Sequence, residues 1–554
     1  MVKPRRTIAD GRARRVSLGI LCAASLAVAP VAFAVGTPPA TDATVGSANT
    51  AEQVSAAVEH FDVWEIQVEG NTLLPQVAVE RAVYNHLGEH RTLDDVQAAQ
   101  RELEDAYHGR GYGSVLVDIP EQDVDGGIVI LKVTEAKIAR TKVTGSRYFS
   151  LGRIRSKVPS LAPGTVPNLP LVQQELAELG KLSSDRVITP VLKPSRTPGR
   201  LDVELKVKDE LPLHGSLDLN DRFSADTSRL RLNASIRYDN LWQREHSIGL
   251  SYQTSPQAPD EVEVFAANYL WRFENSDHLL SAYAVRSNSN VATVGTLGVL
   301  GAGTIAGLRY TVPLPGIGTY YHSVSVGADY KDFQENIGLQ GNDTLQTPIS
   351  YLMFLGTYNG SYFGKSTVSH FELGFNAGPS GFGNTQKEFE LKRFKSKPNF
   401  AYLRAHLDHL MPLLRGTSFF SRLDGQVADS PLISNEEYAA GGVDSVRGYQ
   451  ESEKQADDAL AMSFELRSPN LKPGHWEALQ QAELFAFTDA ADLHIKSPLP
   501  GAKPDKFLWS TGVGVRLNAI EHVQATLIWA HPLKNGDRVR AGDDRVHFNL
   551  GYEF

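Results

Sequence analysis

The chain has 554 residues, 42% of them hydrophobic, and a formal net charge of −9 at pH 7. A single hydrophobic core rarely grows beyond about 250–300 residues, so this length predicts at least two structural units. Residues 1–34 carry six basic side chains and one acidic one, and without them the formal charge is −14. A chain this acidic is not expected to bind nucleic acid.

The first 34 residues have the organisation of a secretory signal peptide. A basic segment precedes the apolar run Val16–Ala34, which ends in Ala32-Phe33-Ala34, and we expect cleavage after Ala34. The pair Arg14-Arg15 leaves twin-arginine export open as an alternative to the general route. Cys22, the only cysteine, lies in the apolar run, so we expect no disulfide and no cysteine metal site in the mature chain.

Residues 35–60 are rich in Ala, Thr, Pro, Gly and Ser and are expected to form a linker. Residues 61–138 then show the order strand, helix, helix, strand, strand, which residues 139–211 repeat. Val143-Thr144-Gly145 corresponds to Val68-Glu69-Gly70, and Leu205-Lys206-Val207 corresponds to Leu131-Lys132-Val133. Two tandem α+β domains are therefore predicted, and one larger α+β domain is the alternative. The expected strands and helices of the two domains are strands 63–68, 114–119 and 127–133 with helices 76–87 and 92–108, then strands 186–192 and 201–207 with helices 151–158 and 171–179.

From residue 212 to 554 the pattern changes to short strands in which apolar and polar residues alternate, as in residues 230–238, 509–517 and 546–554. A soluble β-sandwich gives the same alternation. Charged residues on the polar faces, such as Arg231 and Arg516, and aromatic residues near strand ends favour a membrane barrel. No segment after the leader has the 18 or so apolar residues that a membrane helix needs, which leaves the closed barrel as the membrane-spanning fold. The length suits about sixteen antiparallel strands, with fourteen or eighteen as alternatives.

The most informative short motif is Val446-Arg447-Gly448-Tyr449, within the long segment 429–460. Arginine supplies a fixed charge with a planar donor fork, glycine permits a turn closed to other residues, and tyrosine offers a stacking face with a polar tip. Such a tetrapeptide suits a loop tip held against a carboxylate, although an ordinary surface turn is the alternative for four residues alone.

In this context the tetrapeptide resembles the VRGY signature of outer-membrane barrels that follow periplasmic POTRA domains. The chain is similar to the two-partner secretion branch of that superfamily. The resemblance implies that the signature lies at the tip of an extracellular loop folded back into the barrel lumen, with Arg447 against Asp489 on a neighbouring strand. The family usually has glycine two residues after this aspartate, where this chain has Ala491. The chain ends on an aromatic residue, Phe554, which resembles the signal that such barrels present to the barrel assembly machinery.

The resemblance implies a transmembrane β-barrel preceded by two periplasmic POTRA domains, located in the outer membrane of a Gram-negative cell. Its function would be to recognise an unfolded exoprotein through the POTRA domains and to secrete it across the outer membrane. The expected partners are that client, of haemolysin or filamentous haemagglutinin type, and outer-membrane lipid. An outer-membrane protein assembly factor of the same superfamily is the alternative, and a passive porin is a third class.

No catalytic motif stands out in the sequence. His406 and His409 fall on opposite faces of one strand, which does not suit a shared metal ion. The glycine-rich segment 301–307 lacks the strand-loop-helix context of a nucleotide site. We therefore expect no enzyme activity, no cofactor and no metal site.

Overall fold

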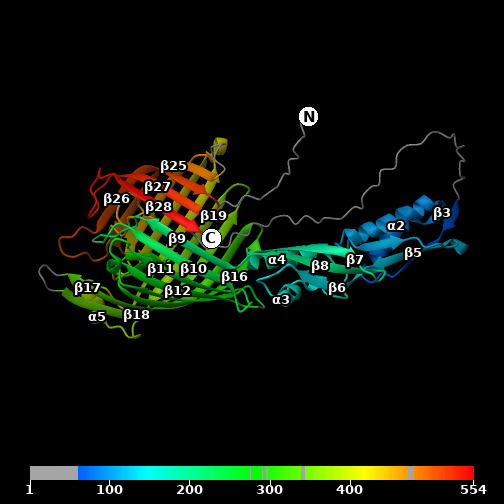
Figure 1. The fold of residues 1–554 in the computed structure, drawn as a ribbon, viewed down its shortest axis with the longest axis horizontal. Helices are drawn as coiled ribbons and strands as arrows, with labels where there is room; N and C mark the ends of the chain where they lie inside the picture. Colours follow the sequence, from blue (N-terminus) through cyan, green and yellow to red (C-terminus); the bar gives the residue numbers. More distant parts are fainter. Residues whose placement is uncertain are drawn as a thin grey trace, which may run out of the picture. The chain divides into compact units, whose positions relative to one another are not determined.

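The computed structural model describes residues 60–554 apart from 226, 275, 290, 295, 296, 339–343 and 472–477. The predicted signal peptide 1–34 and nearly all of the predicted linker 35–60 lie outside the described residues. The described chain forms two compact units, one that ends at Pro212 and one that starts at Leu213 (Figure 1). Within the described residues no helix has the length and apolar character required to cross a bilayer.

The first unit opens with the predicted order strand, helix, helix, strand, strand. The capping box expected at Thr92 and Asp95 is present and starts the second helix. The first helix ends at Val83 and continues as one 3-10 turn, so the prediction of helix up to residue 87 was too long. A short strand that was not predicted follows it and pairs with the first strand. The elements are β1 (Phe61–Val63), β2 (Glu65–Glu69), α1 (Gln76–Val83), β3 (Gly88–Arg91), α2 (Leu93–His108), β4 (Val115–Asp118) and β5 (Ile128–Glu135), with the sheet order β2-β5-β4.

The same arrangement follows a second time in the first unit, with its own buried core. Its parallel and antiparallel strand pairs match those of the first repeat, because β6 runs parallel to β8 as β2 does to β5. The fourth helix starts two residues before the predicted position, where the side chain of Asn168 accepts a hydrogen bond from the N–H of Leu171. The elements are β6 (Lys137–Thr144), α3 (Leu151–Ser156), α4 (Leu169–Leu182), β7 (Arg186–Pro194) and β8 (Arg200–Asp209), with the sheet order β6-β8-β7.

Both repeats are closed by the same turn after their first parallel strand. Gly70 and Gly145 have φ angles of 87° and 89°, and an added Cβ would lie 2.3 Å from the carbonyl oxygen of Val133 or Val207 respectively. Only glycine fits such a position, because it lacks the Cβ and tolerates positive φ. A carboxylate at the end of the last strand of the repeat binds the loop that follows this glycine: Asp209 accepts hydrogen bonds of 2.9 Å from the N–H groups of Arg147 and Tyr148.

The first repeat has Glu135 in the equivalent place. Its Oε1 accepts hydrogen bonds from the N–H groups of Thr72 (2.7 Å) and Leu73 (2.9 Å). The internal repeat detected in the sequence therefore extends to the acid that ends each domain.

The second unit is a closed barrel of sixteen antiparallel strands, as predicted. Figure 1 shows β17 and β18 projecting beyond their neighbours. Two short hairpins are not part of the barrel wall. They are β14 (Val291–Val294) with β15 (Leu297–Leu300), and β22 (Tyr438–Ala440) with β23 (Lys454–Ala456). The barrel strands are β9 (Leu213–Asn220), β10 (Arg231–Leu241), β11 (His246–Thr254), β12 (Glu263–Arg272), β13 (Leu279–Ser287), β16 (Gly303–Ile317), β17 (Tyr320–Gly338), β18 (Thr344–Phe363), β19 (Val368–Gly378), β20 (Phe400–Pro412), β21 (Ser418–Ala428), β24 (Asp458–Arg467), β25 (Leu479–His494), β26 (Asp505–Ala519), β27 (Val523–Pro532) and β28 (Arg545–Glu553).

The alternation read from the sequence separates the two faces of the barrel wall. On β26, Trp509 and Val513 are 42% and 51% exposed, whereas the adjacent Ser510 is fully buried on the other face. Exposed apolar side chains that alternate with buried polar ones are the pattern of a lipid-facing band around a polar lumen.

The barrel closes where the last strand, β28, pairs with the first, β9. This ladder runs only from Asn549–Asn220 to Glu553–Ser216, whereas β27 and β28 pair from Val523–Tyr552 to Ala530–Arg545. Beyond the ladder, the carboxylate of Asp221 accepts a hydrogen bond of 2.9 Å from the N–H of Phe548. A side chain thus continues the closure where the backbone pairing stops.

Because successive strands are antiparallel, alternate connections lie at the same end of the barrel. Four connections that lie together at one end are the 379–399 loop, which contains α5 (Gln386–Lys392), the 429–457 loop, which contains β22 and β23, the 495–504 loop and the 533–544 loop.

Candidate functional site in the barrel lumen

The motif Val446-Arg447-Gly448-Tyr449 lies at the tip of the 429–457 loop, which folds into the lumen. Two glycines with φ angles of 111° and 98°, Gly441 and Gly442, turn the chain inward just before the motif. Val446 and Tyr449 are fully buried and Arg447 is 5% exposed, so the motif is surrounded by protein.

Arg447 binds the barrel wall through every nitrogen of its guanidinium. Nε and Nη2 donate to the two carboxylate oxygens of Asp489, each at 2.7 Å, and the Arg447 backbone N–H donates to the same carboxylate at 3.0 Å. Nη1 donates to Glu465 at 2.6 Å and Nη2 donates to Ser463 at 2.9 Å. The guanidinium carbon also lies 3.6 Å from the ring centroid of Phe487. The structure thus brings Arg447 and Asp489 together in a bidentate pair, the strongest geometry for such ions.

A second carboxylate, Glu465, was not singled out in the sequence. It lies on β24 beside Asp489 and accepts hydrogen bonds from Arg447, Arg467 and Arg516. The signal that could have found it is the alternation along β24, which places Ser463 and Glu465 on the same face of a strand that neighbours β25. Because both carboxylates are at most 4% exposed, the three guanidinium groups neutralise acids that would otherwise be buried unpaired.

Gly448 connects the loop tip to the strands that close the barrel. Its φ angle is 90°, and a Cβ added there would lie 3.2 Å from the Cβ of Ala530. Its N–H donates to Nε2 of His547 at 3.0 Å, so the ring proton of this histidine sits on Nδ1, which is 3.0 Å from the carboxylate of Asp221. The loop tip, β28 and the end of β9 are therefore linked through one imidazole.

Tyr449 and Val446 complete the tip by packing. The Tyr449 hydroxyl lies within hydrogen-bonding distance of the carbonyl oxygens of Trp509 (2.9 Å) and Lys534 (2.7 Å), next to β26 and the 533–544 loop. Val446 belongs to a buried cluster that includes Ala491, which is fully buried. The methyl group of Ala491, where the family resemblance predicts glycine, is thus accommodated in this buried cluster.

Arg222, just after β9, forms ion pairs with acidic residues before and after the motif. It pairs with Asp444 and, at 3.2 Å, with Glu451, and the N–H of Glu451 donates to the carbonyl of Phe223. On β21, Arg422 donates to the carbonyl of Asp444 at 3.0 Å. The loop is therefore fixed to strands on several sides of the lumen.

Phe554 is 57% exposed and lies at the base of the first strand. Its backbone N–H and carbonyl exchange hydrogen bonds of 3.0 Å with Gly215 on β9. Its ring covers Gly215, where an added Cβ would lie 2.4 Å from the ring.

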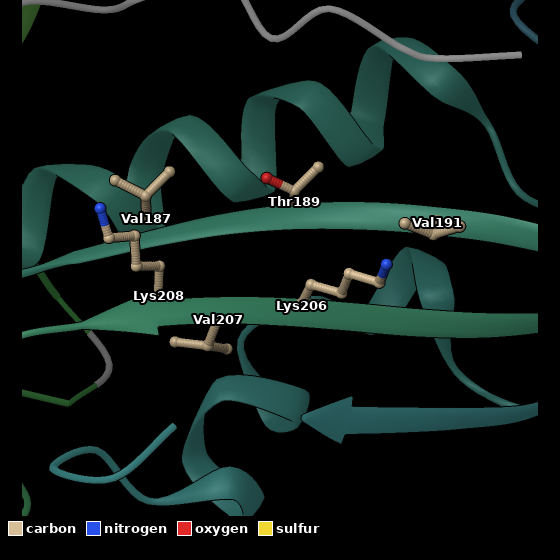
Figure 2. Close-up of a pocket in the computed structure, with 6 residues that line it drawn as sticks. All are labelled: Val187, Thr189, Val191, Lys206, Val207 and Lys208. Carbon is tan, nitrogen blue, oxygen red and sulfur yellow. The ribbon is translucent and has the colours of Figure 1, made fainter. Parts of the chain in front are cut away.

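The first unit carries a shallow hollow on the open face of the second POTRA sheet. Figure 2 shows Val187, Thr189 and Val191 on β7 beside Lys206 and Lys208 on β8. Val187 is 63% exposed, and β7 is the outer strand of its sheet, so this corner offers both a free strand edge and an apolar row with lysines alongside.

Comparison with known proteins agrees with this geometry. The model of the haemolysin secretion/activation protein family ShlB/FhaC/HecB matches residues 199–517, and that of the ShlB-type POTRA domain matches residues 61–136. A curated relative, the outer membrane transporter CdiB of Dickeya dadantii, is 21% identical over 489 residues, covering 82% of this chain and 80% of the relative.

Among solved structures, CdiB from Escherichia coli has a TM-score of 0.57 at 17% identity, covering 91% of this chain and 93% of that one. BamA from Haemophilus ducreyi lacking POTRA domains 1–3 has a TM-score of 0.55 at 13% identity, covering 89% and 100%. These likenesses show a shared fold of POTRA domains and barrel. With the family match over more than half of its length, this chain belongs to the haemolysin secretion/activation protein family ShlB/FhaC/HecB, the outer-membrane transporters of two-partner secretion.

Proposed function

We propose that this transporter receives its secreted exoprotein at the POTRA domains in the periplasm and passes it, unfolded, through the barrel lumen, and that the 429–457 loop holds the lumen wall in the conformation that transport requires. The observation that carries the proposal is the buried pair between Arg447 and Asp489. It joins the loop tip to the wall of the lumen. The client we propose is of the haemolysin or filamentous haemagglutinin type.

The entry point we propose is the corner of the second POTRA sheet at β7. An extended client segment can add to a free strand edge through backbone hydrogen bonds, and its side chains can then contact the neighbouring face. Pro190 and Pro194 lack the N–H that such pairing uses, so we place the added strand along the part of β7 before Pro190. Val187 and Thr189 lie there, with Lys208 alongside (Figure 2).

A photo-crosslinking amino acid at position 187 tests this entry point in cells that secrete the client. We expect a crosslinked adduct to the client from position 187 and none from position 171, where Leu171, which is 51% exposed, lies on α4. Adducts of equal yield from both positions would contradict the proposed entry point.

The transport function is tested by deletion of the chain and comparison of the culture supernatant with the outer-membrane proteins. We expect one large protein to disappear from the supernatant while the membrane proteins stay unchanged. A joint fall of many barrel proteins in the membrane would instead support an assembly factor.

Phe554, whose exposed ring lies over Gly215 on β9, is the residue we propose as the assembly signal. Phe554→Ala is expected to lower the amount of barrel in the membrane.

A further inference from the structure

The lumen is filled by apolar side chains at the end that carries the 429–457 loop. Inward-facing side chains of the wall, including those of Phe333, Tyr351 and Phe400, are at most 3% exposed there. Two loops supply the side chains that complete this cluster. Phe389 comes from α5 in the 379–399 loop, and Leu432 comes from the 429–457 loop; each is 1% exposed. Because both loops contribute buried side chains to this cluster, a polypeptide that passes through this part of the lumen must displace them.

The 379–399 loop packs into this cluster through α5. Its helix α5 has only seven residues, and Phe389 is the buried residue of that helix. The ring of Phe389 lies 5.9 Å from that of Tyr351 and 6.0 Å from that of Phe400. Leu391 and Phe394 are each 46% exposed. A helix this short does not persist without tertiary contacts, and two of these come from Phe389 and from the residue that follows the helix.

That residue is Arg393, which connects this loop to the 429–457 loop. Its Nη1 and Nη2 donate to the two carboxylate oxygens of Asp457 at 2.7 Å and 2.6 Å. Nη1 also donates to the carbonyl of Leu432 at 2.5 Å and pairs with Glu437. Arg393 is in no strand of the barrel ladder, so this ion pair joins loop to loop and leaves the wall itself untouched.

Asp457 is the centre at which three loops meet. Besides the guanidinium of Arg393, it accepts hydrogen bonds from the N–H groups of Leu432 (2.6 Å) and of Lys496 (2.7 Å), the latter in the 495–504 loop. The carboxylate is fully buried, and Arg393 is the cation that pairs with it. Loss of that cation would leave a buried charge with backbone donors alone, which strongly favours separation of the loops.

We propose that Arg393 is a positioning residue for transport: it couples the 379–399 loop to the 429–457 loop at Asp457, so that the two loops close the lumen as one unit and leave it together when a polypeptide passes. This inference rests on the proposed passage of the client through the lumen. The loop coupling itself is measurable in the purified barrel without any client, so its failure can be distinguished from failure of the transport proposal.

The first test is the conductance of the full chain in planar bilayers, with Arg393→Ala compared with the control Lys397→Ala. Lys397 is an exposed cation of the same loop, four residues further on. We expect Arg393→Ala to increase the fraction of time in conducting states by at least about tenfold, since a buried carboxylate loses its partner. Arg393→Lys is expected to fall between the two, because an ammonium group cannot bind both oxygens of Asp457 at once.

The second test reports the loop movement directly. Ser396 is fully buried and donates to the carbonyl of Phe389 at 2.6 Å, so Ser396→Cys introduces a hidden thiol at the base of α5. We expect a membrane-impermeant maleimide to label this cysteine at least about tenfold faster when Arg393→Ala is added, and also when Arg447→Ala is added, because the loops leave together.

Equal conductance for Arg393→Ala and Lys397→Ala, in barrels that keep their compact mobility on unheated gels, would overturn the proposal. So would labelling of Ser396→Cys that responds to Arg393→Ala but not to Arg447→Ala. If Arg393→Ala does not assemble, Asp457→Asn, which keeps the shape of the side chain, takes its place with the same expected outcomes.

Discussion

Arg447→Ala is the perturbation that the structure addresses most sharply. The substitution removes four side-chain hydrogen bonds, two of them to Asp489 and one each to Glu465 and Ser463. Glu465 keeps Arg467 and Arg516 as partners, whereas Asp489 keeps, among the described residues, only the backbone N–H of residue 447. The cost therefore falls on Asp489, which is fully buried.

Removal of one partner from a buried ion pair typically costs about 3–5 kcal/mol. A bidentate, fully desolvated pair belongs in that range, and 3 kcal/mol already changes an equilibrium by more than about a hundredfold. We therefore expect the loop tip to leave its site and secretion of the client to fall at least about tenfold. Arg447→Lys is expected to recover only part of the secretion, because lysine cannot form the fork to both oxygens.

Client in the supernatant is the primary measurement, and the level of compact barrel in the outer membrane is the second. Arg415→Ala, an exposed arginine in a turn at the other end of the barrel, is the matched control. Normal secretion by Arg447→Ala, with the loop tip still protected from protease, would show that this ion pair does not hold the loop for transport. Loss of the barrel from the membrane would show that the pair serves folding, and the transport role would then be refuted as well.

Three further predictions follow from single positions. Gly448→Ala places a Cβ on a residue with a φ of 90°, 3.2 Å from the Cβ of Ala530, so we expect the free energy of unfolding to fall by about 1–3 kcal/mol. The compact barrel should then unfold at a lower temperature, and an unchanged unfolding temperature would contradict this prediction. Gly145→Ala should unfold the second POTRA domain, because the added Cβ would clash with the carbonyl oxygen of Val207; circular dichroism of residues 60–212 measures this. Gly164→Ala is the control: Gly164 also has a positive φ, but an added Cβ meets no atom within 4 Å, so we expect the fold to stay intact. Partial burial raises the pKa of Asp209, but hydrogen bonds from Tyr148, Ser146 and Arg147 outweigh it and hold the pKa below its usual value. This stabilisation is present above the ordinary pKa of about 3.9 and is lost as the pH falls through the lowered value. The free energy of unfolding from urea titrations should therefore fall less steeply below pH 4 in Asp209→Asn than in the unchanged chain. The same pH dependence in both proteins would count against this prediction.

The parts of the fold that depend on local pattern could be predicted from the sequence. Alternation in residues 230–238, 509–517 and 546–554 predicted half-buried strands, and the charged and aromatic residues on them favoured a membrane barrel. Helical periodicity with a capping box at Thr92 predicted helices of the first unit. The length suited about sixteen strands and left fourteen or eighteen open, and the closed sheet confirms sixteen. Strand β3 was missed because Gly88–Arg91 contains no apolar alternation and forms only through its pairing with β1.

The lumen could be predicted only in part. Arg447 and Asp489 were expected to meet because a family resemblance brought them together, and nothing in the spacing of 42 residues does so. Glu465 could have been found from the alternation along β24. His547 and Arg393 carry no local signature, since each acts on a partner supplied by a distant part of the chain. Such positions depend on the closure of the sheet, which a chain read from one end to the other does not reveal.

The short ladder between β28 and β9 has a consequence for how the barrel can respond to a client. His547 contacts both Gly448 on the loop and Asp221 beyond the end of β9, so loop and seam share one group. Thermodynamic linkage is reciprocal: if the docked loop stabilises the closed seam by some free energy, the closed seam stabilises the docked loop by the same amount. Any force that loosens one of them, including the pull of a chain threading the lumen, therefore weakens the other to an equal degree.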